Sequence, residues 1–241
     1  MALSMRGFAK KRKEKQMEEQ KFRGLDYKID YVFCVDGSAR MRDNILAFKA
    51  FVPTLRDKLR NRMESYGKEL NRLRVKVIVF RDFAAEGNPM EVSPFYEIYG
   101  GEKDETEDFL AFVNGIEAVG GSDSSNAYEA LALAMKSDWT RAGDVRRHVI
   151  QLSTNAPALP LKEREFYPGY PEDMPADFFE LRELWSGKYM ERRPKRMHIY
   201  APDYPCWNEF LVWENTIVVP SGWEYYSDFE LATSMNILSA L

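Results

Sequence analysis

Short apolar runs recur along the chain, and they predict β-strands. The runs are rich in β-branched and aromatic side chains and are too short for buried helices. Their apolarity is nearly continuous rather than alternating, so we expect strands that are covered on both faces. The five runs span residues 31–35, 75–80, 149–152, 197–200 and 216–219.

Helical periodicity fills the intervals between these runs. Apolar side chains recur there at steps of three and four residues, which is the spacing of one helix face. Pro53 lies inside the first stripe and should kink or interrupt its helix. Asp104 or Thr106 is the expected N-cap of the second helix. The stripes span residues 45–59, 109–116, 127–135 and 229–238, the last of them starting from Ser227 or Asp228.

Strands that alternate with helices predict βαβ units and a mainly parallel sheet. Residues 155–195 interrupt the alternation with six prolines and one short helical stretch near residues 177–185. Strand-like runs resume after this segment, so we interpret it as an ordered insertion and not as a domain boundary. We therefore expect a single domain over residues 24–241.

The charge is unevenly distributed. The net charge of −4 combines a leader over residues 1–23, with eight Lys and Arg against three Glu, and a body that carries −9. The acidic body argues against a generic nucleic-acid binder. The leader is either a basic arm for an acidic or phosphate-bearing partner or a solvated helix, so nucleic acid is expected only through this arm.

The chain has features of a cytoplasmic protein. No apolar run approaches the roughly 20 residues that a membrane span needs, and the first residues lack an apolar signal region. Two cysteines make no disulfide framework, and a reducing compartment is the simpler expectation. We expect no contact with a membrane.

Polar residues gather in three loops between the predicted strands and helices. The first strand ends in Asp36-Gly37-Ser38-Ala39-Arg40, a Gly-Gly-Ser-Asp turn at 120–123 opens the third helix, and Thr154-Asn155 follows the third strand run. Ligands of open α/β sheets bind beyond the carboxyl ends of the strands. We expect these three loops to form one site.

The three loops resemble those of the von Willebrand factor type A (VWA) family, which carry a metal-ion-dependent adhesion site. Asp36 and Ser38 match the first loop, Asp-x-Ser-x-Ser, and Ser122 or Asp123 stands at the Thr or Asp of the second. Thr154-Asn155 stands at the Thr-Asp of the third. The run Phe80-Arg81-Asp82-Phe83 and Trp139 are also similar to phrases in bacterial VWA proteins.

The resemblance covers residues 28–157 by motif. It implies a Rossmann-like fold: a three-layer α/β sandwich with a doubly wound, mainly parallel sheet. It also implies a non-catalytic protein–protein interaction module. Within the family the chain is most similar to bacterial proteins of stress-response and conflict systems, which points to one component of a multi-protein assembly.

The sequence departs from the family pattern at two of the expected ligands. The resemblance implies Mg²⁺ bound by Asp36, Ser38 and Asp123, because this cation prefers oxygen ligands. Arg40, however, replaces the second serine, and Asn155 replaces the usual acidic residue. A guanidinium has no acceptor atom and stays charged. We expect a degenerate site without a cofactor, in which Arg40 pairs with Asp36 or Asp123 in place of the metal.

Two functions of different classes follow. The leading one is a module whose protein partner binds at Asp36, Ser38, Arg40, Ser122, Asp123 and Asn155. The alternative is a metal-assisted hydrolase or phosphoryl-transfer enzyme that uses Asp36, Asp82 and Asp123, since such a site needs converging carboxylates. A third hypothesis is an RNA-associated factor that acts through the basic leader.

Other reactive residue types have ordinary explanations. His148 and His198 lie in or beside strand runs and should pack there, and Cys34 and Cys206 lack the surroundings of a reactive thiol. Ser38 has no Gly-x-Ser-x-Gly context, so we do not expect a nucleophile. Tryptophans gather in the last third of the chain, and we expect most to be packing residues and some to be exposed near Asp36. They are Trp185, Trp207, Trp213 and Trp223.

Overall fold

The computed structural model describes residues 26–85, 88–141, 145–187, 190 and 195–220. The predicted leader at 1–23, the helix predicted from Ser227 or Asp228, and Trp223 lie outside these residues. The described strands form one sheet in the order β3-β2-β1-β5-β6-β7, with β4 also paired to β2. Their bounds are β1 (Tyr27–Asp36), β2 (Leu70–Phe80), β3 (Met90–Val92), β4 (Tyr96–Tyr99), β5 (Val145–Ser153), β6 (Lys195–Ala201) and β7 (Thr216–Pro220).

The sheet is mainly parallel, as predicted. β1 pairs in parallel with β2 on one side and β5 on the other, so that Cys34 lies beside both Ile78 and Leu152. β6 and β7 extend the parallel order, whereas β3 and β4 run antiparallel to β2. The sequence pattern missed β3 and β4, because each is short and interrupted by a glutamate.

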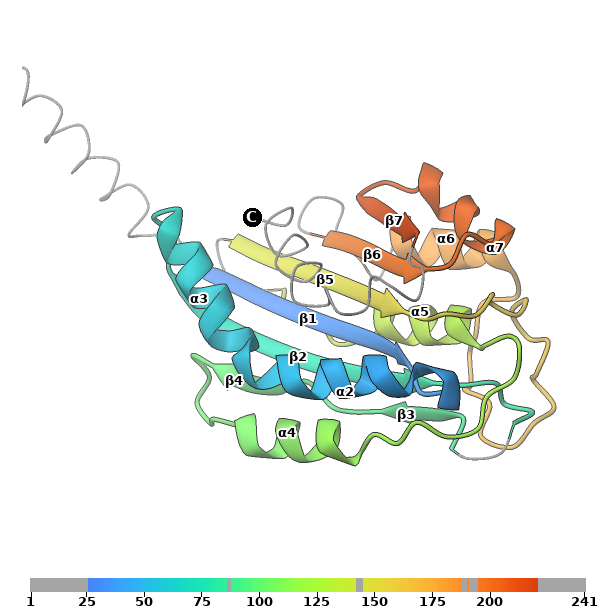
Figure 1. Ribbon diagram of the computed structural model, residues 1–241. Helices are drawn as coiled ribbons and strands as arrows, with labels where there is room; N and C mark the ends of the chain where they lie inside the picture. The colour runs from blue at the N-terminus through green and yellow to red at the C-terminus, as the bar shows by residue number, and fades with distance from the viewer. Residues whose placement is uncertain (1–25, 86–87, 142–144, 188–189, 191–194, 221–241) are drawn as a thin grey trace, which may run out of the picture.

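Helices cover both faces and make three layers (Figure 1). Odd-numbered residues of β1 and β2, such as Phe33 and Val77, pack with the side chains of α2 (Arg42–Phe51), α3 (Leu55–Ser65) and α4 (Thr106–Gly115). Even-numbered residues, such as Val32 and Ile78, pack with α5 (Ala127–Met135), α6 (Phe178–Ser186) and α7 (Pro205–Asn208). Because successive side chains of a strand point to opposite faces of the sheet, the buried core consists of two clusters, one on each face.

The helix boundaries follow the local sequence. Pro53 interrupts the first predicted helix: α2 ends at Phe51, and a 3-10 turn at Val52–Thr54 leads into α3. Neither predicted residue is the N-cap of α4, which is Glu105. Asp104 still accepts a hydrogen bond of 3.0 Å from the Thr106 amide, so its carboxylate satisfies an N-terminal N–H from one position further out.

The insertion between β5 and β6 folds back over the α5 layer. Ser125 and Ala158 form a parallel bridge, and the insertion residues Leu161, Met174 and Leu181 join the buried cluster under α5. Asp177 caps α6 by accepting a 2.9 Å hydrogen bond from the Glu180 amide. Burial and capping therefore hold the described part of this segment in place, despite its prolines.

The prediction that some tryptophans are exposed differs from the structure. Trp185, Trp207 and Trp213 are all buried, so the expectation of exposed tryptophans near Asp36 is wrong for these three. In the described part of the insertion, the exposed aromatic side chains are Phe166, Tyr167 and Phe179. Among the described helices, none combines the length and apolarity that crossing a membrane requires.

Candidate functional site

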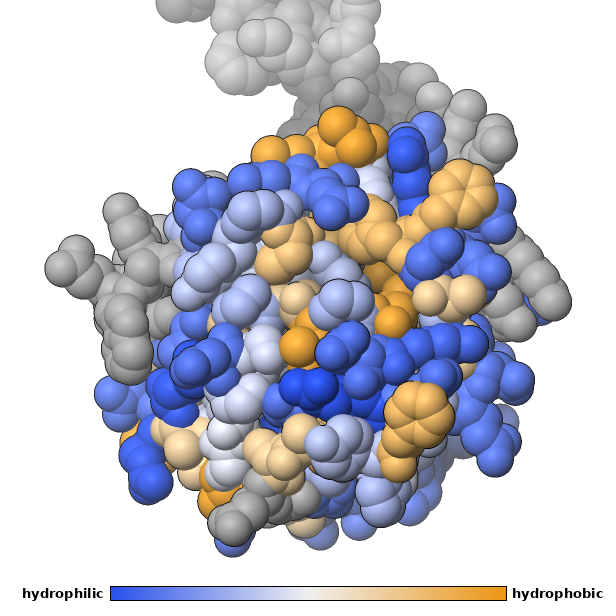
Figure 2. Space-filling view, turned by 90° about the vertical axis from the view of Figure 1, so that its right-hand side faces the viewer, coloured by the Kyte–Doolittle hydropathy of each residue, from blue (hydrophilic) through white to orange (hydrophobic). Residues whose placement is uncertain are grey.

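The carboxyl ends of β1, β2 and β5 bring the three predicted loops together at one edge of the sheet. The Gly37 amide donates to the Phe80 carbonyl (2.9 Å), and the Ala39 amide donates to the Gly120 carbonyl (3.0 Å). The edge is the right-hand side of Figure 1 and faces the viewer in Figure 2, where it is largely hydrophilic with separate hydrophobic side chains.

Asp36 is fully buried at the end of β1. Its Oδ1 accepts a hydrogen bond from the Ser38 amide (2.9 Å), and its Oδ2 accepts one from the Thr154 hydroxyl (2.7 Å). Burial raises the pKa of this carboxyl, and the two hydrogen bonds and the charge of Arg40 only partly oppose that effect. Asp36 thus ties the first loop to the third.

Arg40 occupies the rim where the first and second loops meet. Its Nη2 donates to the Ser122 carbonyl (2.5 Å) and to Asp123 Oδ1 (3.0 Å). Asp123 is fully exposed, whereas the Arg40 side chain is two-thirds covered. Of the two partners considered for Arg40, the structure places the ion pair with Asp123.

Asp82, after β2, is buried and accepts three hydrogen bonds. Its Oδ2 accepts from the Ser122 hydroxyl (2.6 Å), while its Oδ1 accepts from Arg164 Nε (3.0 Å) and from the Ala84 amide (2.9 Å). Burial alone would raise the pKa of Asp82, but these hydrogen bonds and the Arg164 charge outweigh it and lower that pKa. Arg164 comes from the insertion, and no sequence signal linked it to Asp82.

A hollow of about 770 Å³ opens between these loops. Residues 120–124 of the second loop line this hollow, and so do Asp82, Ala84 and Arg164. The described lining contains neither histidine nor cysteine. The hollow therefore offers carboxylate, hydroxyl and guanidinium groups to a ligand, but no evident nucleophile and base.

Arg81 holds the loops behind the hollow in place. Its buried guanidinium donates to the carbonyls of Gly37 (2.9 Å), Glu117 (2.7 Å) and Asn88, and it pairs with Glu91 (2.8 Å). Those groups come from three separate segments, because Asn88 and Glu91 belong to one stretch of chain. The Phe-Arg-Asp-Phe run singled out in the sequence thus contributes a buried clamp through its arginine.

Two oxygens at the edge have no hydrogen-bond partner among the described residues. They are Ser38 Oγ and Asn155 Oδ1, both shielded from solvent. The Asn155 amide group faces the Arg40 carbonyl at 3.5 Å. Both of these predicted site residues therefore lie at the edge with Asp36 and Arg40.

The three carboxylates of the enzyme hypothesis are engaged separately. Asp36 bonds to Thr154, Asp82 to Arg164, and Asp123 to Arg40. Within the described ranges, no group of three His, Cys, Asp or Glu residues is arranged to hold a metal ion.

The remaining reactive residues pack as the sequence indicated. His148 and His198 are buried in the sheet, and His148 Nε2 lies 2.9 Å from the Thr140 carbonyl. Cys34 is buried and its thiol contacts the Ala130 carbonyl. Burial raises the pKa of both Cys34 and Cys206, which disfavours the reactive thiolate.

A buried polar cluster between α5 and the insertion was not anticipated. Glu129, on α5, is fully buried; its Oε1 accepts a 2.8 Å hydrogen bond from the Tyr170 hydroxyl, while its Oε2 has no partner among the described residues. Burial raises the pKa of Glu129, and the Tyr170 hydrogen bond opposes this in part. The cluster links α5 to the insertion.

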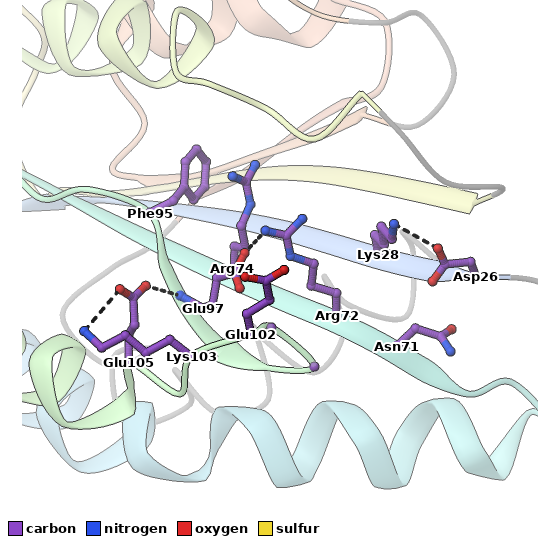
Figure 3. Close-up of a pocket in the computed structure, with 12 residues that line it drawn as sticks. Asp26, Lys28, Asn71, Arg72, Arg74, Phe95, Glu97, Glu102, Lys103 and Glu105 are labelled. Atoms are coloured by element: carbon purple, nitrogen blue, oxygen red, sulfur yellow. Dashed lines mark hydrogen bonds and ion pairs between the residues drawn. The ribbon is translucent and has the colours of Figure 1, made fainter.

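A second hollow of about 770 Å³ lies over the amino-terminal halves of β1 and β2 (Figure 3). Its cations have acidic partners: Lys28 pairs with Asp26 and Arg72 with Glu97. Arg74 binds Asp30 through two hydrogen bonds of 2.9 and 2.7 Å and stacks over Phe95. These internal pairs leave little free charge for a ligand.

The architecture defines a three-layer, mainly parallel α/β sandwich with a polar loop site at the carboxyl edge, compatible with a Rossmann-like VWA fold. The sequence matches no known protein-family profile and no curated protein.

Solved structures share this fold at low sequence identity. The pilus adhesin SpaC from Lactobacillus rhamnosus GG superposes with a TM-score of 0.51 at 10% identity, over 89% of this chain and 31% of SpaC. Proximal thread matrix protein 1 from the mussel byssus gives 0.50 at 11% identity, over 88% of this chain and 48% of that protein. The chain thus spans less than half of either structure, and the likeness concerns the fold alone.

Proposed function

We propose that this chain is a non-catalytic protein–protein interaction module whose partner binds at the carboxyl-edge loops. The observation that carries the proposal is the Arg40 guanidinium, held between the Ser122 carbonyl and the exposed Asp123 carboxylate beside an open hollow. Arginine is one of the residue types enriched among the anchors of protein interfaces, where a partner covers it. Asp36, Ser38 and Asn155 support the loops that present it.

The donor set does not fit Mg²⁺. A fixed cation occupies the rim and engages Asp123, while both Asp36 oxygens already accept protein hydrogen bonds. We infer that Arg40 takes the place of the metal implied by the VWA resemblance, so that the module binds its partner without a cofactor. The enzyme alternative with Asp36, Asp82 and Asp123 gains no support from this arrangement.

The setting of the module is a finer part of the proposal. The sequence resemblance to bacterial VWA proteins supports a component of a cytoplasmic multi-protein system, of the stress-response or conflict type. From the adhesin and the matrix protein we carry over only the fold. If the basic leader binds nucleic acid, the protein should retard generic RNA or DNA in an electrophoretic mobility-shift assay, and the effect should weaken as the salt concentration rises.

The test is affinity capture from the native host, quantified by mass spectrometry, with charge-reversal variants. Arg40→Glu should remove the stoichiometric partner. Lys103→Glu is the matched control, because Lys103 is an exposed cation beside the second hollow, and it should retain the partner. Circular dichroism spectra and thermal denaturation curves show whether both variants fold. Retention by Arg40→Glu, or loss with Lys103→Glu alone, would contradict the proposed site.

A further inference from the structure

Resting on the proposed function, we propose that Phe166 is an aromatic anchor that the partner protein receives in an apolar pocket with a basic rim. Phe166 lies in the turn formed by residues 161–170 of the insertion. Its side chain is 91% exposed, the highest value of any large hydrophobic side chain in the described part of the chain. An aromatic ring left in water is a source of binding energy once a partner covers it.

The turn is rigidly attached to the module at both sides of Phe166. On one side, Arg164 Nε donates to the buried Asp82 carboxylate at 3.0 Å. On the other side, the Tyr170 hydroxyl donates to the buried Glu129 at 2.8 Å and accepts from the Lys162 amide at 2.9 Å. Both anchors are buried carboxyl groups, so displacing the turn would leave Asp82 without its cation and Glu129 without its hydrogen bond from Tyr170.

Backbone hydrogen bonds and backbone geometry also fix the turn. The Glu165 amide donates to the Lys162 carbonyl (3.1 Å) and the Tyr167 amide donates to the Arg164 carbonyl (3.0 Å). Lys162 has a φ of 63°, a conformation that persists in a non-glycine residue only where the surroundings impose it. Phe166 is therefore held out in solvent by an ordered turn, and a preorganised anchor loses little conformational entropy on binding.

The turn is continuous with the proposed interface. Arg164, two residues before Phe166, lines the hollow at the carboxyl edge. A partner that contacts Arg40 and the second loop would need only to extend across Arg164 to reach Phe166. Phe166 therefore belongs to the turn that borders this hollow.

The charges around Phe166 define the rim of the receiving pocket. Exposed acidic side chains predominate on this part of the insertion, and Lys162 is the exposed cation among them. Arg164 pairs with both Asp82 (3.0 Å) and Glu163 (3.6 Å), so its charge is balanced within the protein and Glu165 is the acidic side chain directly beside Phe166 in the sequence. Because complementary potentials favour association, the partner should place Lys or Arg around its pocket. The acidic residues are Glu163, Glu165, Glu172 and Asp173.

The first experiment places the photo-crosslinking amino acid p-benzoylphenylalanine at position 166 in the native host. Mass spectrometry then identifies the residues to which it becomes attached. Attachment to apolar residues that have Lys or Arg neighbours, on the protein captured through Arg40, is the expected result. Attachment to a second copy of this chain, to its own residues 1–23, or to an acidic segment of the partner would overturn the proposal.

The second experiment measures binding of the purified partner by calorimetry. Phe166→Ala should weaken the affinity at least tenfold, and Phe166→Leu should restore part of it. Phe179→Ala is the matched control, because Phe179 is an exposed phenylalanine of α6, and it should change the affinity less than twofold. Glu165→Lys should also weaken binding, and more strongly at low salt.

The outcomes separate this inference from the proposed function. Loss of binding with Arg40→Glu and unchanged binding with Phe166→Ala would overturn the anchor and leave the module standing. Unchanged binding with Arg40→Glu would overturn the proposed site, whatever Phe166→Ala does. Equal weakening by Phe166→Ala and Phe179→Ala would also overturn the anchor.

Discussion

Gly121 approaches Ser38 so closely that a Cβ atom on Gly121 would lie 2.4 Å from the Ser38 Cβ. The φ of Gly121 is also positive, at 89°. The second loop of the site can therefore rest on the first only because position 121 carries no side chain. This contact brings Ser122 and Asp123 within reach of Asp82 and Arg40.

Gly121→Ala should destabilise the protein by about 2–4 kcal/mol, the sum of left-handed backbone strain and overpacking. Chemical denaturation measures the loss. Gly169→Ala separates the two causes, because Gly169 has a φ of 82° but nothing within 4 Å of a built Cβ. It should cost about 1–2 kcal/mol from strain alone. Equal losses at the two positions would show that the contact with Ser38 yields readily.

Glu129→Gln should change how stability depends on pH. The folded-state pKa of Glu129 is raised by burial, so the folded protein retains this proton longer than the unfolded chain, where the pKa is about 4.3. Wild-type stability should therefore fall as the pH rises from about 4.3 towards the folded-state pKa. The variant lacks this loss and should be the more stable protein at neutral pH, as urea midpoints from pH 4 to 8 would show.

Tyr170→Phe provides the control for that experiment. It removes the hydroxyl that stabilises the charged form of Glu129, so the pKa of Glu129 should rise further and the pH dependence should steepen. In the Glu129→Gln background the same change should leave the pH profile unaltered. A profile that does not respond to Glu129→Gln would show that another group titrates in this range.

Arg164 and Asp82 should be energetically coupled. A double-mutant cycle with Arg164→Gln and Asp82→Asn should give a coupling of about 1–3 kcal/mol, because Asp82 is buried while Arg164 is partly exposed. The folded-state pKa of Asp82 lies below its unfolded value of about 3.9. Its stabilisation is therefore present above that pH and is lost as the pH falls through the folded-state pKa.

The exposed helical pair Arg60–Glu64 is the matched control for this cycle. Its side chains are 40% and 60% exposed and approach to 3.7 Å. Such surface pairs are coupled by only about 0.3–0.5 kcal/mol. A coupling of that size for Arg164–Asp82 would mean that the insertion is attached mainly by its other contacts.

Arg40→Ser should create affinity for Mg²⁺. The change removes the rim cation, releases Asp123 and restores the serine of the Asp-x-Ser-x-Ser pattern that the first loop resembles. Calorimetry with MgCl₂ should detect stoichiometric binding to Arg40→Ser, which Asp36→Asn should remove from the double variant. Stoichiometric Mg²⁺ binding by the wild type would contradict the substitution of Arg40 for the metal.

The sequence predicted the parts of the fold that arise from repeating patterns. The nearly continuous apolar runs correctly located the five parallel strands. The runs in β1, β2, β5 and β6 are largely buried, whereas β7 at the end of the strand order is only partly buried and exposes Ile217. Pro53 correctly marked the break between α2 and α3. β3 and β4 were missed, because a strand of three or four residues is too short to show a recognisable pattern of apolar side chains.

The site was predictable only in part. The loops could be found because parallel strands end at one edge, but the partner of Arg40 could not be chosen from sequence. The Ser122 carbonyl determines the partner, because its hydrogen bond holds the Arg40 guanidinium beside Asp123. Arg164 was missed because 82 residues separate it from Asp82. Such a contact depends on the path of the insertion, which no local periodicity encodes.

The Arg81 clamp has a consequence for how binding specificity can change. Its guanidinium satisfies carbonyl groups behind the loops, while the side chains that face solvent take no part in that hydrogen-bonding network. Arg81 thus supports the backbone of the edge independently of the side chains displayed at positions 123 and 166, whereas Arg40 also holds the Ser122 carbonyl. If the proposed function is correct, substitutions at positions 123 and 166 should change which partner binds and leave the loop backbone in place.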